Sequence, residues 1–153
     1  MSRKPTGRAV RLASIGGLMA LLLMACSNGA QNALPSGEKG DYVRQVQPIC
    51  KDVRQELTKP LGADPAHQAD VLAHAREQLQ AIPVPDPDLT ALTMFRVQFS
   101  NVAYSMEDAA QGVAVGDHTR ADQSVQTAKN VVRQLHDTAE DNNFGACTQL
   151  FTS

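Results

Sequence analysis

The chain has no tryptophan, and aromatic residues make up only 4% of its 153 residues. Because large aromatic side chains contribute strongly to hydrophobic cores, we expect a modest core. No apolar run reaches the roughly 20 residues that a membrane-spanning helix needs. After the first 25 residues, no long stretch alternates apolar and polar residues as a half-buried strand does. These absences exclude a spanning helix and favour an all-helical protein.

Catalytic signatures are also missing. The chain has no Gly-x-Ser-x-Gly turn and no glycine-rich phosphate loop, and its histidines have no evident Ser or Cys partner. Paired acids occur at Glu107-Asp108 and at Asp86/Asp88, but adjacent acids on a helix point in different directions. We therefore expect no enzymatic activity and no cofactor, and an enzyme whose site is assembled from such acids is the least favoured alternative.

The first 25 residues predict a signal peptide. Four basic residues (Arg3, Lys4, Arg8 and Arg11) precede an uncharged stretch from Leu12 to Ala25. A basic segment followed by 7–15 apolar residues and a small residue is typical of secretory signals.

The end of this segment, Leu23-Met24-Ala25-Cys26, resembles the lipobox of bacterial lipoproteins. The resemblance implies that Cys26 receives diacylglycerol and further acyl chains such as palmitate, and that the chain is cut just before it. Met24 departs from the small or β-branched residue usual there. The alternative is an ordinary signal peptide with an unrelated cysteine nearby.

Charge supports anchoring by lipid. Cleavage before Cys26 removes four basic residues and leaves 10 Lys and Arg against 16 Asp and Glu, a net charge of −6. Such a charge argues against binding to nucleic acid or to anionic lipid by electrostatics. Two or more acyl chains hold a protein firmly. We expect the extracytoplasmic face of the cell membrane, or the outer membrane if the cell has two.

The three cysteines fit this location. With Cys26 lipidated, Cys50 and Cys147 remain, and exported proteins keep disulfides. We predict a Cys50–Cys147 disulfide. The alternative is two free buried thiols; a zinc site is disfavoured because there is no CxxC spacing.

Residues 26–40 are small, polar and turn-forming, which predicts a flexible tether after Cys26. Residues 41–153 are enough for one domain. Apolar residues at 3-4 spacing predict helices over about 42–57, 64–82, 86–115 and 117–140. Pro48 either starts the first helix or kinks it. Gly116-Asp117 forms a tight turn, so the last two helices are antiparallel. We predict an up-down four-helix bundle.

The domain resembles small extracytoplasmic lipoproteins of high-GC Gram-positive bacteria. The resemblance rests on Asp41-Tyr-Val-Arg-Gln-Val-Gln-Pro-Ile-Cys50, the proline-rich link before the third helix, the Gly116-Asp117 turn and Phe144-Gly-Ala-Cys147. It implies a helical bundle with one cysteine in the first helix and one near the C-terminus, and it says almost nothing about activity.

Three groups of residues could bind a ligand. His67, Asp70 and His74 share one face of the second helix, although two helical turns separate the histidines, and a solvated face explains them equally well. His118 and Asp122 fit a surface pair. His136 lies at the edge of a core stripe, where a haem or metal would need an opposing ligand such as Met94 or Met106.

We therefore expect a membrane-anchored, non-enzymatic interaction or accessory module, with the membrane and an envelope protein as partners. The alternative is an extracytoplasmic carrier that binds a ligand or a metal ion.

Overall fold

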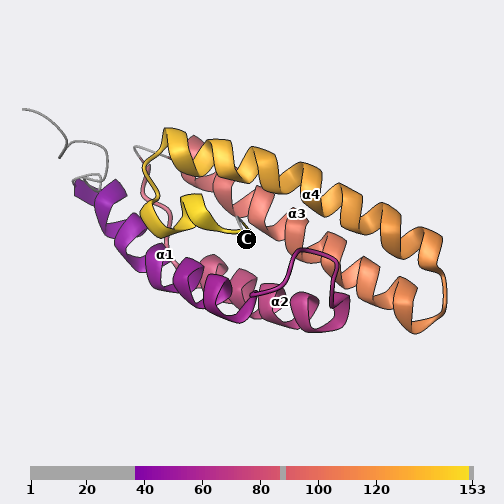
Figure 1. The fold of residues 1–153 in the computed structure, drawn as a ribbon. Coiled ribbons are helices and arrows are strands. Elements are labelled where there is room, and N and C mark those ends of the chain that lie inside the picture. Colours follow the sequence, from indigo (N-terminus) through magenta and orange to yellow (C-terminus); the bar gives the residue numbers. More distant parts are fainter. Residues whose placement is uncertain (1–36, 87–88, 152–153) are drawn as a thin grey trace, which may run out of the picture. The chain divides into compact units, whose positions relative to one another are not determined.

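The computed structural model describes residues 37–86 and 89–151 (Figure 1). The predicted cleavage site and lipidated Cys26 lie outside the described residues, as do most of the tether and residues 87–88. Within the described ranges there are no strands. The elements are α1 (Gly37–Glu56), α2 (Pro65–Ala81), α3 (Leu89–Ala114), α4 (His118–Asp141) and a short 3₁₀ helix, η2 (Gly145–Gln149).

The four α-helices form the predicted up-down bundle. Each runs antiparallel to its neighbour in sequence, and α3 packs most extensively, against α4 on one side and α2 on the other (Figure 1). α1 packs against α2 and against η2, which also contacts α4. The C-terminal η2 therefore fills part of the space between the first and last helices.

Local signals define several helix ends. The Asp64 carboxylate accepts a hydrogen bond from the His67 amide at 3.4 Å, and the Asp117 carboxylate accepts one from the Arg120 amide at 3.0 Å. Side-chain acceptors at these positions satisfy amides that a helix start leaves unpaired. Gly116 has a φ of 75°, the left-handed conformation that glycine adopts without a Cβ penalty. Asp64 thus confirms the predicted start of α2, and Gly116 with Asp117 confirms the predicted α3–α4 turn.

The core follows the predicted stripes. On α3 the side chains from Leu92 to Ala109 on the inner face are fully shielded from solvent. The Phe95 and Phe144 rings pack edge to face, with centroids 4.8 Å apart. The inner positions of the four α-helices are Val43, Val46, Cys50 and Val53 on α1, Leu72, Ala75 and Leu79 on α2, Leu92, Phe95, Phe99, Val102, Met106 and Ala109 on α3, and Ala121, Val125, Ala128, Leu135 and Ala139 on α4.

Two boundaries differ from the sequence-based expectation. α1 begins at Gly37 rather than near residue 42, so the end of the predicted tether is helical. The Lys39 ammonium donates to the Asn142 carboxamide oxygen at 3.0 Å, which ties this first turn to the end of α4. Pro48 lies inside α1 and does not start it.

Val113 was predicted in the α3 core stripe, but 46% of its surface is exposed. Val113 lies in the last turn of α3, and this end of α3 extends beyond α2 together with α4 (Figure 1).

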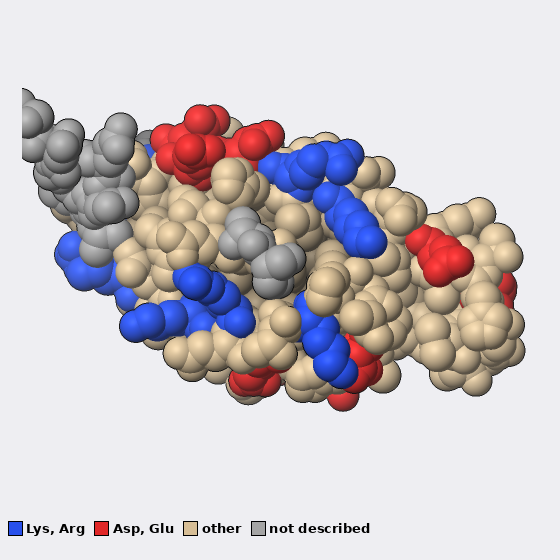
Figure 2. All heavy atoms as spheres, viewed as in Figure 1, with Lys and Arg blue, Asp and Glu red and all other residues tan. Residues whose placement is uncertain are grey.

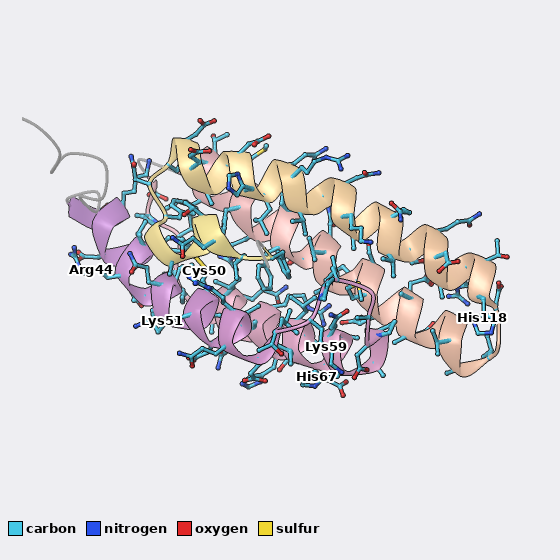
Figure 3. All side chains as sticks on the ribbon, in the orientation of Figure 1. Arg44, Cys50, Lys51, Lys59, His67 and His118 are labelled. Atoms are coloured by element: carbon cyan, nitrogen blue, oxygen red, sulfur yellow. A yellow bond between two sulfur atoms is a disulfide. The ribbon has the colours of Figure 1, made fainter. Side chains whose placement is uncertain are left out.

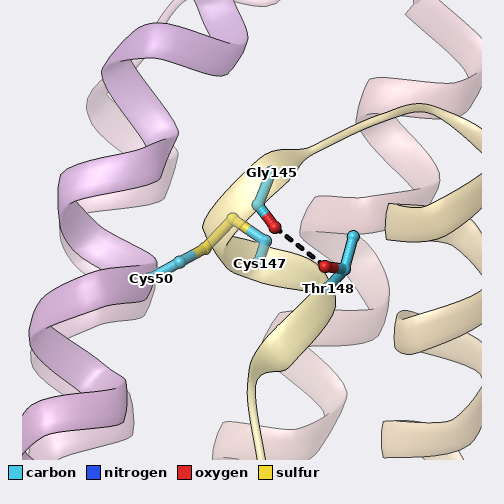
Figure 4. The surroundings of a disulfide bond; sticks show 4 residues. All are labelled: Cys50, Gly145, Cys147 and Thr148. Atoms are coloured by element: carbon cyan, nitrogen blue, oxygen red, sulfur yellow. Dashed lines mark hydrogen bonds between the residues drawn. A yellow bond between two sulfur atoms is a disulfide. The ribbon is translucent and has the colours of Figure 1, made fainter. Parts of the chain in front are cut away.

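Cys50 and Cys147 form the predicted disulfide, which links α1 to η2 across 97 residues of sequence (Figure 4). Both cysteines are buried. Within η2, the Thr148 hydroxyl donates to the Gly145 carbonyl at 2.8 Å. The sequence analysis placed Cys147 just after the fourth helix and did not predict η2.

Candidate functional site

A groove between α1 and α2 contains the three candidate residues of the second helix. His67, Asp70 and His74 are exposed and line it from α2. Its volume is about 340 Å³, which lies within the ~300–1,000 Å³ range of small-molecule sites. Figure 3 shows His67 near the start of α2.

The structure adds two acids that the sequence analysis did not connect with this group. Asp52 and Glu56, four residues apart on α1, line the groove from the opposite side. No Lys or Arg in the described part of the chain pairs with Asp52, Glu56 or Asp70. The groove therefore carries three unpaired carboxylates and two imidazoles, a combination that attracts cations. The i, i+4 spacing of Asp52 and Glu56 predicts from the sequence that both acids share one face of α1. It does not predict that α2 packs against that face.

The groove does not assemble a metal centre as it stands. Among residues 37–86 and 89–151, no three His, Cys, Asp or Glu side chains converge closely enough to hold a metal ion. His74 Nε2 instead lies 3.0 Å from the Gln78 amide nitrogen, whose N–H can donate to it. The predicted trio thus shares a groove without converging on one point.

The other candidate residues lie apart from this groove. His118 begins α4 at the α3–α4 turn, away from His67 (Figure 3). His136 Nδ1 is 3.9 Å from the nearest Asp137 carboxylate oxygen and 3.8 Å from that of Glu140, so surface acids surround it. Met106 is fully buried in the core, whereas half of the Met94 surface is exposed. Of the described residues that line the depression beside His136, none is Met94 or Met106.

The paired acids Glu107 and Asp108 point to different partners, as expected for neighbours on a helix. The Arg76 guanidinium of α2 donates to Glu107 at 2.7 Å. Asp108 accepts hydrogen bonds from Arg120 and from the Ser124 hydroxyl. The hydrogen bond from Arg120, and after it the one from Ser124, lowers the pKa of the Asp108 carboxyl below its usual value. Both acids thus hold neighbouring helices together.

The outer face of α3 carries an exposed apolar stripe. Met94, Val97 and Tyr104 have 50%, 53% and 54% of their surfaces exposed. With the exposed Asn101 they follow a 3-4-3 spacing, which places all four on one side of the helix, opposite the core. The sequence analysis followed only the inner stripe of this helix and missed the outer one.

One end of this outer stripe is held in place. The Arg76 guanidinium carbon lies 4.3 Å from the centroid of the Tyr104 ring, and the same guanidinium pairs with Glu107. A cation stacked on an aromatic face is stabilised by the ring quadrupole. Tyr104 is therefore an exposed aromatic side chain that is already oriented.

No protein-family model, curated protein or solved structure matches the chain. None of the helices in the described ranges is long and apolar enough to cross a bilayer.

Proposed function

We propose that this protein is a lipid-anchored cell-envelope lipoprotein whose helical bundle is a non-enzymatic interaction module. The observation that carries the proposal is the outer stripe of α3, which exposes Met94, Val97 and Tyr104. The anchor rests on the sequence of residues 1–26. The Cys50–Cys147 disulfide supports it, since two of the three cysteines are paired and only Cys26 is left for lipid.

The partner we propose is an amphipathic helix of another envelope protein. A 3-4-3 stripe is the pattern into which the apolar face of a second helix packs. Tyr and Arg are enriched among residues that dominate binding energy, and Arg76 and Tyr104 lie together at one end of the stripe. Because Arg76 already orients the ring, less side-chain entropy is lost on binding.

The interaction is tested by photocrosslinking in intact cells. A photoreactive amino acid at Val97 should give one discrete adduct, and Met94→Ser with Tyr104→Ser should abolish it. The same amino acid at the exposed Gln126 of α4 is the matched control and should give none. Equal adducts at both positions, or none at Val97, would refute the docking face.

The anchor is tested separately by labelling cells with radioactive palmitate. The protein should carry label, and Cys26→Ala should remove it. An unlabelled protein with Cys26 intact would exclude the lipoprotein and leave the docking face to be judged by crosslinking alone.

A second candidate function is a carrier of divalent cations in the α1–α2 groove. Asp52, Glu56 and Asp70, which no Lys or Arg of the described residues neutralises, favour it, and rotation of the exposed His67 and His74 side chains would supply nitrogen ligands. Zn²⁺, Ni²⁺ or Cu²⁺ should raise the melting temperature, and His67→Ala with His74→Ala should abolish the rise. His136→Ala, outside the groove, is the control. No shift with any of these ions would remove this candidate.

A further inference from the structure

Beside α4, two neighbouring depressions form a cleft that neither function above uses. The larger has a volume of about 500 Å³ and is lined by α4 together with Leu150 and Phe151. The smaller, about 200 Å³, lies between α4 and the connection from α1 to α2. Val132 and Phe151 line both depressions, so the two adjoin at this pair of side chains.

The end of the chain builds one wall of this cleft. The disulfide holds η2 against α1, and the Leu150 amide that follows donates to the Cys147 carbonyl at 3.3 Å. Leu150 is buried, whereas the next residue, Phe151, is half-buried with a φ of 65°. A bulky residue rarely adopts this left-handed conformation. Phe151 adopts it here, and its side chain lines both depressions.

The lining of the smaller depression is apolar with two cations. Leu57, Pro60 and Leu61 contribute apolar surface from the α1–α2 connection. Lys59 from the same connection and Lys129 from α4 also line it, and both are exposed. Figure 3 shows Lys59 on this connection.

The cations of the cleft are not neutralised by the rest of the described chain. No Asp or Glu within the described ranges pairs with Lys59, Lys129 or Arg133, the last of which lines the larger depression and donates to Asn130 at 2.7 Å. Among the described residues, Asp137 is the only acid in the lining, and it lies beside His136 in the larger depression. Figure 2 shows basic side chains around the middle of this face and acidic ones towards its edges.

We propose that this cleft binds a long-chain fatty acid. The carboxylate would lie between Lys59 and Lys129, and the acyl chain would run over Val132 and Phe151 towards Leu150. The positive charges of Lys59 and Lys129 select an anion. The apolar floor selects an acyl chain, because each buried CH₂ stabilises the complex whereas a fully polar anion would leave this floor exposed. The site requires neither the lipid anchor nor the outer face of α3.

The probe is dodecanoate, titrated calorimetrically into the full chain with its disulfide intact. We expect one molecule bound per chain, tighter binding than for octanoate, and none for acetate. Lys59→Gln and Lys129→Gln should each raise the Kd roughly fivefold, as expected for one partly solvated ion pair. Lys51→Gln, the same change on the exposed side of α1 and outside the cleft, should leave the Kd unchanged. Val132→Asn should weaken binding without changing the helical circular dichroism.

Three results would overturn the proposal. The first is no dodecanoate binding. The second is binding that is equal in all the lysine variants, which would indicate non-specific adsorption elsewhere on the chain. The third is sedimentation with phosphatidylglycerol vesicles that depends on Lys59 and Lys129 while free dodecanoate does not bind. That pattern would assign the face to a membrane surface instead.

Discussion

At the scale of single residues, the phenol of Tyr42 is the clearest conflict within the core. Its side chain is 1% exposed, and its hydroxyl has no hydrogen-bond partner among the described residues. Burial raises the pKa of Tyr42 to about 12, although the nearby Arg96 charge opposes this shift. A buried hydroxyl without a partner costs free energy, so the ring is retained for its packing and not for its polar group.

This residue makes stability depend on pH in the alkaline range. Because the folded-state pKa lies above the unfolded value near 10, the folded chain holds the proton longer. Stability from this group is complete below about pH 10 and is lost as the pH rises towards 12. At about pH 11 the loss should reach about 1 kcal/mol, measured as the free energy of unfolding in urea.

Tyr42→Phe should remove this part of the alkaline loss and leave stability near neutral pH unchanged or slightly higher. Tyr104→Phe, which changes the other tyrosine of the chain, is the control and should keep the loss. If wild type and Tyr42→Phe weaken equally between pH 8 and pH 11, buried Tyr42 does not carry the effect.

Gly112 shows a second constraint at this scale. An added Cβ would lie 2.8 Å from the Ala121 nitrogen and 3.0 Å from the Asp117 carbonyl oxygen. Both are backbone atoms at the start of α4, which cannot move as a flexible side chain can. Gly112→Ala should therefore lower stability by about 1–3 kcal/mol, although alanine is the better helix former by about 1 kcal/mol.

The measurement for Gly112→Ala is thermal unfolding followed by circular dichroism. Gln111→Ala, at the exposed neighbouring position, should leave the melting temperature nearly unchanged. A Gly112→Ala variant as stable as the wild type would mean that α4 can move away from α3 at this turn.

At the scale of elements, hydrophobic spacing predicts which face of each helix is buried. It does not predict along how much of that face another helix packs. The inner stripe of α3 from Leu92 to Ala109 was predictable because 3-4 spacing reports only the geometry of its own helix. Val113 continues that spacing and is exposed, and it lies in the last turn of α3, at the end that extends beyond the start of α2. The start of α1 was missed for a similar reason, because a tertiary contact from Lys39 to Asn142 supports it.

The candidate site was less predictable than the helices. His67, Asp70 and His74 share a face as predicted, but Asp52 and Glu56 join them only through the packing of α1 on α2. The five residues of η2 have too short a span for any periodicity. The disulfide from Cys147 holds η2 beside α1. The predicted pairing of Cys50 with Cys147 was therefore the one sequence feature that indicated where this segment lies.

Pro48 gives a prediction about α1. The residue lies inside the helix, is exposed, and has no amide N–H to donate to the carbonyl one turn earlier. Pro48→Ala should restore that hydrogen bond and raise the free energy of unfolding by about 1–3 kcal/mol. The measurement is urea unfolding, with the exposed Gln55→Ala on the same helix as the control. A loss of stability would show that the packing of α1 against α2 and η2 requires the proline.

At the scale of the whole molecule, α1 depends on other elements more than α3 and α4 do. α3 packs along both α2 and α4, whereas α1 contacts α2 and the short η2. Arg76 and Asp108 add bonds between α3 and its two neighbours. We therefore expect the disulfide between α1 and η2 to be the main constraint on the less supported side of the bundle.

Reduction of this disulfide should lower the free energy of unfolding by about 4–5 kcal/mol, since the bond joins residues 97 apart and restricts the unfolded chain accordingly. Reduced wild type is the better comparison than Cys50→Ala with Cys147→Ala, because both cysteines are buried and the double variant also leaves a cavity. The measurement is urea unfolding of oxidised and reduced protein, followed by circular dichroism.

Hydrogen exchange shows where the loss of stability falls. After reduction, amides of α1 and η2 should exchange faster than before, while those in the middle of α3 and α4 should change least, because α1 and η2 are the elements that the bond joins. Oxidised and reduced protein with the same unfolding midpoint would show that packing alone holds α1 in place. Uniformly faster exchange would mean that the bundle opens as one unit, so that the disulfide stabilises α3 and α4 as much as the helix it holds.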